Sequence, residues 1–503
     1  MLNSNTVFSA AQTPRFSKTI SDIEADLSRL DDEMSQLQMA MDHLATERQK
    51  LKMSLDEYRS LVAPIRRIPP EILCEMFINC LVDGPDSLDA TKAPLHLTFV
   101  CSRWRRVAIS TPRLWSYISL YKVPIAMELL QTWLLRSGSS PLTLVFKPGD
   151  VVAGSSYFHT IIPHSHRWQN VTFSSVEAHF ALLEDRGAEI KDHLPMLERL
   201  DLGHNEFMDR RMTIFENAPM LNTVTLKESR GCLLPWRQLK HFHAYTFSTT
   251  ECYELLKQCV NLTHCTFEGS YKDSDILDTS TLVPLVHSQL QSLCLVSDDG
   301  DEICLLLSSI ILPALQVLNI STTGEFSLPH QTHVSSFLGR SSCDLQCLTL
   351  QISWQDVELI AFLQRLPSLV ELTLRECASL LVTERVLRQM TCDLPGSHVL
   401  VPKLKRLTVS ASLSVDNQII VDMVQSRRRH PGLLRDNSGV NDSETLHQVE
   451  TLEFISLDFD CWMLEPVTIA QIASLQEIGL EVELKNLGER VALFDYELTV
   501  NSE

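Results

Sequence analysis

Three histidines, His241, His243 and His264, are the side chains whose types and spacing come nearest to a metal site. His241 and His243 would share one face of a strand, and a sheet could bring His264 beside them. Neutral imidazoles in such an arrangement can ligate zinc, copper or iron. Surface imidazoles are more often solvated or hydrogen-bonded, so we expect no metal and no cofactor. A metal-dependent enzyme is the weakest functional hypothesis.

Sequence motifs that would carry catalysis are missing. There is no G-x-x-x-x-G-K-[ST], no G-x-S-x-G, no H-E-x-x-H and no C-x-x-C. The acidic run SDDGDE (297–302) lacks the ligand spacing of a calcium loop and is expected to form an exposed turn. The 14 cysteines are expected to be free thiols that serve as small apolar side chains. We predict that the protein is not an enzyme.

The composition is that of an acidic globular protein. Hydrophobic residues make up 44% of the 503 residues, and the net charge of −20 argues against binding to duplex nucleic acid. Residues 1–17 lack the apolar core of a signal peptide and are expected to be disordered. The most apolar window, 302–315, is too short to span a bilayer. We therefore expect no membrane association and a location in the cytoplasm, the nucleus or both. The basic run RRRH (427–430) could be a nuclear-import signal, but it is too unspecific to decide between these compartments.

A phrase of the form PMLERLDLGHN recurs from Pro195 onwards. Copies such as PALQVLNISTT and PSLVELTLREC follow at intervals that are mostly 18 to 30 residues. This pattern predicts an α/β leucine-rich-repeat solenoid over 195–485, with a parallel sheet on its concave side and helices outside. Residues 121–194 are expected to be a transition with degenerate first repeats. We expect a mobile insertion around 425–446 and a C-terminal tail over 486–503.

Alternation within each repeat predicts which side chains face the concave side. Counted from the leucine that opens each copy (Leu197 in the first), positions 4 and 6 turn inward, so positions 3, 5 and 7 turn outward from the strand. This surface is polar and mixed in charge, which favours a protein target over a small molecule. The expected target-binding residues are Arg199, Asp201, Thr223, Thr225, Lys227, His241, His243, Tyr245, His264, Glu268, Glu371, Arg375 and Arg406.

Apolar residues between 18 and 62 form a narrow stripe. They are spaced alternately three and four apart, as the a and d positions of a heptad repeat are, and only Arg48 interrupts the row. We predict one long coiled-coil helix that pairs with a second copy, with another protein or with its own chain. Its charges are acidic early and basic late, which would also permit antiparallel pairing. The stripe residues are Ile20, Ile23, Leu27, Leu30, Met34, Leu37, Met41, Leu44, Leu51, Leu55, Tyr58 and Val62.

A short helical unit is expected within residues 63–120. Pro64 ends the long helix because it has no amide hydrogen, whereas Pro69 and Pro70 are tolerated in the first turn of a new helix. Apolar residues then follow at helical spacing in PEILCEMFINC (70–80) and in LHLTFVCSRWRRVA (95–108). So small a unit cannot bury all of these side chains, and another surface is expected to cover them.

The runs RRIPPEILCEMF (66–77) and LTFVCSRWRRVAISTPRLWSYISL (97–120) together resemble the F-box motif, as it occurs in a large family of mushroom-type (basidiomycete) fungi. Ile68 stands where that family usually has leucine, which is a volume-conserving change. The resemblance implies a three-helix F-box domain over 63–120 that docks on the Skp-family adaptor of cullin-based ubiquitin ligases. The residues it assigns to this contact are Ile68, Pro69, Glu71, Ile72, Leu73, Val100, Cys101 and Trp104.

Two functional hypotheses follow. In the first, the chain is the non-catalytic substrate receptor of a Skp–cullin–F-box ubiquitin ligase, and its repeats hold the target protein close to the ligase. In the second, it is a coiled-coil scaffold whose F-box-like helices only cap the solenoid. The sequence does not identify the target.

Overall fold

The computed structural model is an α/β protein with a long N-terminal helix and a large parallel sheet. Its described residues divide into two compact units, Met1–Cys80 and Leu81–Glu503. No described helix is both long and apolar enough to cross a lipid bilayer. The structure describes residues 13–81, 92–120, 127–146, 157–173, 183, 186–203, 212–226, 232–245, 248–269, 283–322, 328–352, 354–375, 383–392, 399–410, 416–428, 449–459, 471–472 and 474–486.

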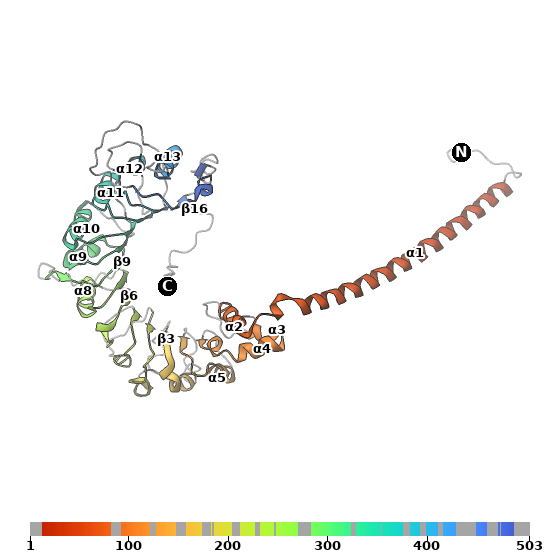
Figure 1. Ribbon diagram of the computed structural model, residues 1–503, viewed down its shortest axis with the longest axis horizontal. Coiled ribbons are helices and arrows are strands. Elements are labelled where there is room, and N and C mark those ends of the chain that lie inside the picture. Colours follow the sequence, from red (N-terminus) through yellow and green to blue (C-terminus); the bar gives the residue numbers. More distant parts are fainter. Residues whose placement is uncertain are drawn as a thin grey trace. The chain divides into compact units, whose positions relative to one another are not determined.

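The first unit contains helix α1 (Thr13–Val62), which continues without interruption for 50 residues (Figure 1). It begins five residues earlier than the heptad stripe predicts and ends where Pro64 opens a 3-10 turn, η1 (Pro64–Arg66). Ion pairs three residues apart, such as Arg29 with Asp26 at 3.1 Å, run along its exposed surface. Such pairs add only a few tenths of a kcal/mol each, so they do not by themselves explain so long a helix.

Helix α2 (Pro70–Ile78) follows in the same unit and begins as its two prolines predict. Pro69 is the N-cap residue and Pro70 occupies the first turn, where its missing N–H leaves no intrahelical hydrogen bond unmade. Glu71 in the first turn is favourable at the positive end of the helix dipole. Only Leu73 and Phe77 of this helix are buried.

The second unit begins with helices α3 (Leu95–Val100) and α4 (Ser102–Ile109). Cys101 separates them in an extended conformation and caps α4, because its Sγ accepts a hydrogen bond from the Trp104 amide at 3.4 Å. The two helices are also joined by Arg105, whose Nε donates to the Thr98 carbonyl at 2.9 Å. The 3-10 turn η2 (Pro112–Trp115) follows.

The described part of this second unit is built on a fourteen-stranded sheet in which all neighbouring strands are parallel (Figure 1). The strands of this sheet lie in chain order, as expected when parallel neighbours are joined by crossover connections. The strands are β1 (Tyr117–Leu120), β2 (Leu142–Phe146), β3 (Trp168–Phe173), β4 (Arg199–Asp201), β5 (Thr223–Leu226), β6 (His241–Tyr245), β7 (His264–Glu268), β9 (Ser292–Ser297), β11 (Val317–Thr322), β12 (Cys347–Gln351), β13 (Glu371–Arg375), β14 (Arg406–Ser410), β15 (Phe454–Phe459) and β16 (Glu481–Asn486). A separate pair consists of β8 (Leu285–Val286) and β10 (Ile310–Ile311).

One backbone pattern repeats at the entry to successive strands. The carbonyl of Gln316 accepts two hydrogen bonds, from the amides of Gln346 and Cys347 at 2.8 and 2.9 Å. The residue before each strand of the large sheet from β4 to β14 does the same for the next strand of that sheet: Glu198, Asn222, Lys240, Thr263, Gln291, Gln316, Gln346, Val370 and Lys405. This uniform step keeps successive strands in the same register, so equivalent side chains line up across the sheet.

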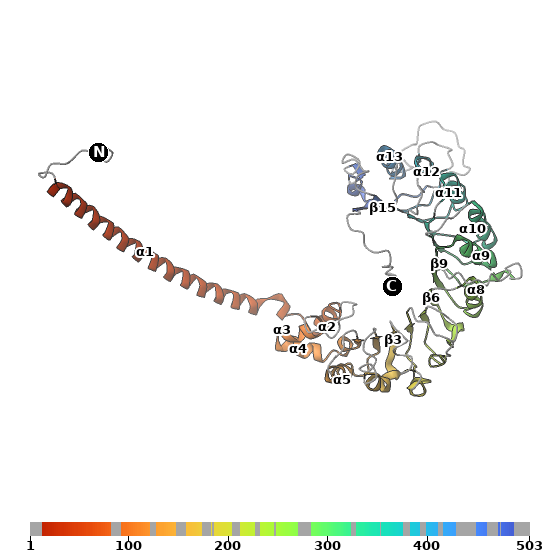
Figure 2. The ribbon, with the colours of Figure 1, turned by 180° about the vertical axis from the view of Figure 1, so that it is seen from behind.

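Leucines of the recurring phrase form the buried layer. In the first clear copy Leu197, Leu200 and Leu202 are at most 1% exposed, and the corresponding residues of later copies are buried in the same way. Helices cover this side of the sheet, as Figures 1 and 2 show from opposite directions. They are α5 (Met127–Arg136), α8 (Thr249–Gln258), α9 (Gly300–Ser309), α10 (Leu328–Ser341), α11 (Asp356–Leu363), α12 (Glu384–Met390) and α13 (Asn417–Arg428).

The sheet begins earlier than the sequence indicates. Strand β1 starts at Tyr117, inside the range 63–120 that the sequence assigns to the helical unit, and β2 and β3 continue the same sheet through the expected transition. Trp115 of η2 is fully buried and meets the Trp133 ring of α5 edge-on, with centroids 4.7 Å apart. Its Nε1 donates to the Ala108 carbonyl at 2.8 Å, which ties the end of α4 to this core.

Two segments expected to be irregular are helical in part. The run SDDGDE is not a simple exposed turn, because Asp299 caps α9 by accepting from the Asp301 amide at 2.9 Å. The expected insertion around 425–446 begins inside α13, which extends to Arg428, while residues 429–446 lie outside the described part of the chain.

Arg427 shows why helix α13 extends so far. Its side chain is 2% exposed, and its guanidinium donates to the carbonyls of Met390, Val401 and Leu400 at 2.8, 3.2 and 2.7 Å. Burial lowers the pKa of this guanidinium from its usual value. Arg427 is therefore a structural residue that donates hydrogen bonds to three carbonyls. Because it is buried, this first arginine of the run RRRH (427–430) is not accessible to a partner that would recognise a basic sequence.

We expect Arg427→Met to reduce the free energy of unfolding by about 3 kcal/mol, because it leaves three buried carbonyls without a donor. Chemical denaturation of the full chain, followed by circular dichroism, measures the change. Arg388→Met is the matched control, since Arg388 is exposed on α12 and pairs with Glu384 of the same helix at 3.4 Å. The control should change stability by about 0.5 kcal/mol or less. Equal effects of both substitutions would contradict the structural role of Arg427.

Candidate protein-binding surfaces

The inner face of the sheet presents the side chains expected from the alternation. Strands β5, β6 and β7 alternate between buried and partly exposed residues along their lengths. The expected target-binding residues on the described strands are partly or fully exposed, and Lys227 lies outside the described residues. The structure brings several of them into contact with one another.

His241 and His264 stack on each other at the centre of this face. The two strands pair with these residues opposite each other, and the ring centroids are 4.6 Å apart with an angle of 22° between the planes. Burial lowers the pKa of His241 to about 4, helped by His264, Arg199 and Lys240 nearby. Burial also lowers the pKa of His264. Near neutral pH the stack is therefore an uncharged aromatic pair on a polar surface.

A second contact lies further along the same strands, two residues beyond His241 and four beyond His264. His243 Nε2 is 3.2 Å from Glu268 Oε1, close enough for an ion pair when the imidazole is protonated, although the geometry is not that of a hydrogen bond. The His243 ring also lies against Tyr245, with centroids 4.3 Å apart. Burial raises the pKa of Tyr245 to about 12, together with the charges of Glu268 and Asp201. These side chains form one continuous polar patch with the stack.

The patch has no arrangement suited to metal binding. Among the described residues, no group of three or more histidine, cysteine or carboxylate side chains is placed to hold an ion. His241 and His264 face each other through their rings, and His243 turns to Glu268. Cys294 on the next strand is half-buried, and burial raises the pKa of its thiol to about 11, so it is not a reactive thiolate.

A smaller group of side chains lies near the C-terminal end of the sheet. Arg406 Nε is 4.0 Å from Glu371 Oε2, and the Arg406 guanidinium lies over the Phe454 ring at 4.2 Å from its centroid. Phe454 lies on the inner face, and the sequence analysis did not assign it, since its segment HQVETLEFI (447–455) departs from the recurring phrase. Its place opposite Arg406 in the paired strands could have been found only from the register of β14 and β15.

The residues in and just before helix α2 that are expected to contact an adaptor differ in exposure. Pro69, Glu71 and Ile72 are exposed, with Ile72 at 53%, and Ile68 is half-buried. Leu73 is fully buried, which corrects its assignment to the contact, because a side chain without exposed surface can only support the helix from within. Met76, one turn beyond Ile72, is 40% exposed and belongs with it on the outer side.

Helices α3 and α4 present a second apolar surface. Val100 is 51% exposed, Cys101 is exposed and Trp104 is half-buried. Phe99, which the sequence analysis did not assign, is 62% exposed beside Val100. Two consecutive large apolar residues at the end of one helix cannot both face its core, and that signal could have identified Phe99.

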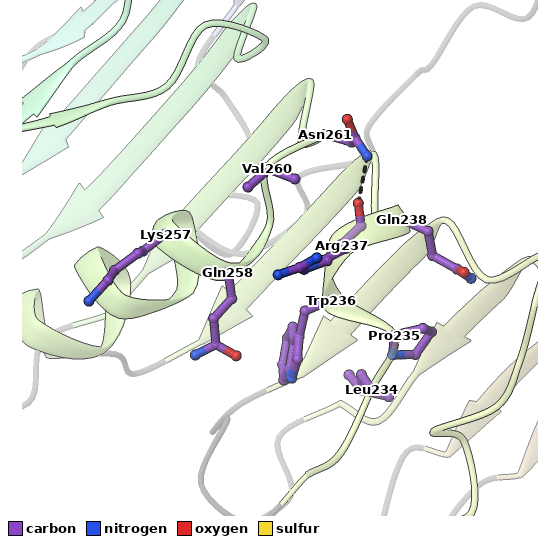
Figure 3. A pocket seen from close by; sticks show the side chains of 9 residues that line it. All are labelled: Leu234, Pro235, Trp236, Arg237, Gln238, Lys257, Gln258, Val260 and Asn261. Carbon is purple, nitrogen blue, oxygen red and sulfur yellow. Dashed lines mark hydrogen bonds between the residues drawn. The ribbon is translucent and has the colours of Figure 1, made fainter.

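A shallow pocket of about 720 Å³ lies outside both surfaces (Figure 3). It is formed by the 3-10 turn η4 (Trp236–Gln238) and the C-terminal end of α8, and Asn261 Nδ2 closes one side by donating to the Arg237 carbonyl at 2.7 Å. Figure 3 shows Arg237, Lys257 and Gln258 on its rim. None of the expected target-binding or adaptor-binding residues lines it.

Comparison with known proteins adds no identification. No protein-family model matches the chain, and no curated protein matches it.

We expect His241→Gln to weaken the dependence of stability on pH between about 6.5 and 4. In this window the unfolded chain binds a proton on His241 and the folded chain does not, so acidification stabilises the unfolded state of the wild type. Denaturation at pH 7.5 measures the packing effect of the substitution alone. At pH 4.5 the wild type should have lost on the order of 1 kcal/mol relative to the variant, since the site is only half-buried. An unchanged difference between the two proteins at both pH values would contradict the low pKa.

Proposed function

We propose that the chain is a non-catalytic substrate receptor of a Skp–cullin–F-box ubiquitin ligase. The observation that carries the proposal is the exposure of large apolar side chains on the helices whose sequence resembles the F-box. Ile72 and Met76 of α2 are 53% and 40% exposed, and Phe99 and Val100 of α3 are 62% and 51% exposed. Exposed apolar side chains of this size on a helix are typical of surfaces that another protein covers.

Burial of these side chains gives an estimate of what a partner would gain. Covering one large aliphatic or aromatic side chain contributes roughly 1.5 to 3 kcal/mol before the entropy lost on association. A few such residues are enough for a stable complex when they are packed together in a partner's pocket. Glu71, exposed in the first turn of α2, adds a charge that could select the orientation of the partner.

The sheet fits the second half of the proposal, in which the unit Leu81–Glu503 is a leucine-rich-repeat solenoid. Three features support it: the recurring phrase, the burial of its leucines and the doubly accepting carbonyl before each strand of the large sheet from β4 to β14. Its polar inner face, with the His241–His264 stack at its centre, would hold the target protein. No bond is made or broken by this chain, and its contribution is to raise the effective concentration of target at the ligase.

The rival hypothesis, a scaffold whose F-box-like helices cap the solenoid, also has an observation in its favour. Trp115 is fully buried against Trp133, so the end of the helical unit does seal the first strands. Deleting residues 65–115 would remove this ring and expose the core under either hypothesis. Point substitutions at exposed positions separate the two, because they leave the Trp115 contact intact.

We expect the double variant Ile72→Asp with Val100→Asp to bind a recombinant Skp-family adaptor at least tenfold more weakly than the wild type does. Two charges placed on apolar contact residues would have to be desolvated in the complex. Affinity is measured by pull-down and by titration with the purified adaptor. Leu135→Asp is the matched control, since Leu135 is 81% exposed on α5 and lies outside both surfaces.

The thermal stability of all three proteins shows whether the substitutions disturb folding. Binding of the control at the wild-type level, with loss in the double variant, would support the receptor. Equal recovery of the adaptor with the double variant and the wild type, or no recovery with either, would leave the cap as the better explanation.

A further inference from the structure

Helix α1 carries an apolar seam that the described residues of the chain do not cover. The twelve a and d residues from Ile20 to Val62 are between 48% and 70% exposed. Most helical stability in proteins comes from packing of an apolar face, and surface ion pairs add little. A seam sustained over six heptads with only one polar interruption is the pattern of a two-helix coiled coil. The remaining problem is what the second helix is.

The charges along α1 identify an occupant. Residues 20–41 contain six acidic side chains and one basic one, whereas residues 43–62 contain three acidic and four basic ones. Two copies side by side in the same direction would place acidic against acidic. Two copies in opposite directions place the acidic half of each against the basic half of the other. The helix is therefore complementary in charge to itself when it is reversed.

We propose that α1 forms an antiparallel coiled coil with a second copy of this chain, centred between Asp42 and His43. In this register Met41 packs against Leu44 of the second copy, and Ile23 at one end packs against Val62 at the other. Arg48 falls opposite Leu37, from where its long side chain can reach Glu33 of the second copy. Every other core layer is apolar on both sides.

The residues that flank the seam decide the register. In the proposed arrangement Glu24 meets Arg59 and Asp31 meets Lys52, and each pair occurs twice because of the two-fold symmetry. The opposite side of the seam brings together Glu33 with Ser54 and Ala40 with Glu47, as well as Asp26 with Leu61. No flanking position sets two like charges opposite each other.

The alternative arrangements are less favourable. A parallel pair in register places Arg48 against Arg48 in the core and sets Asp26 opposite Asp31, with Glu47–Lys52 as its attractive pair. An antiparallel pair shifted by one heptad, with Leu37 against Met41, keeps Glu24 near Lys52 but sets Glu33 opposite Glu47. Flanking charges choose orientation and register more than they add affinity, which comes from the apolar seam.

The proposed pair has a consequence for the rest of the chain. About 40 residues of each helix overlap, so the coiled coil is about 60 Å long. Val62 of one copy and Val62 of the other lie at opposite ends, and the polypeptide continues outward from each. Two copies of the later residues are thus carried on one rod, which allows two simultaneous contacts with a target that offers two sites.

The first experiment compares Leu37→Asp with Met39→Asp in the full chain. The side chains are 66% and 62% exposed, so the single chain tolerates either change equally, but only Leu37 lies on the seam. Sedimentation of the wild type and of Met39→Asp at about 10 μM should give the mass of a dimer. Leu37→Asp should shift the dissociation constant by at least a hundredfold and sediment as a monomer. A monomeric wild type, a trimer or larger assembly, or equal effects of both substitutions would overturn the proposal.

The second experiment tests the orientation by disulfide formation. Met41→Cys and Leu44→Cys are prepared as separate variants, and the wild type with its native cysteines gives the background of covalent dimer. Mild oxidation of the equimolar mixture should give a covalent dimer above background, because Met41 faces Leu44 of the second copy. Neither variant alone should exceed background. Strong crosslinking of Met41→Cys alone would show parallel packing and overturn the antiparallel arrangement.

Discussion

The buried leucine layer between the parallel sheet and its outer helices is the constraint on which the described part of the second unit depends. Side chains alternate along a strand, so the residues between the buried leucines must face the opposite side. A strand displaced by one residue would move Leu348 and Leu350 out of the core and bring polar neighbours into it. The doubly accepting carbonyls repeat the same step from strand to strand. The positions of the side chains on the inner face are therefore fixed by the leucines that are buried on the other face. This holds for any polar residues that the inner face carries.

This dependence explains how much the sequence could predict. The regular recurrence of the phrase was enough to predict the parallel sheet. Period-two alternation within each copy was enough to predict the outward position of residues such as His241 and Arg406. The alternation does not give distances between strands, so it could not show that His241 stacks on His264 while His243 turns to Glu268. Those contacts depend on the register of β6 and β7, which the chain sets at Lys240 and Thr263.

Helical segments were less predictable for a different reason. Helical spacing shows which residues share a face of the helix. It does not show which residues of that face are buried by the rest of the protein and which stay exposed. Ile72 and Leu73 are neighbours in one apolar run, yet one is 53% exposed and the other is buried. Arg427 looked like part of a basic run and is a buried donor to three carbonyls, since the residues that supply them lie 26 to 37 positions earlier. Such contacts have no local signal in the sequence.

The chain separates two kinds of exposed surface, and the separation has a physical reason. The seam of α1 and the outer residues of α2 and α3 are apolar, which gives affinity with little dependence on the partner's exact hydrogen-bonding groups. The inner face of the sheet is polar and carries charges, which discriminate between partners because an unmatched polar group must be desolvated without compensation. Under the proposed function, the first kind would hold a constant partner and the second a particular target. Because the leucine layer is on the far side of the strands, residues such as Thr225 or Arg375 can change without disturbing it, so specificity can vary while the scaffold is preserved.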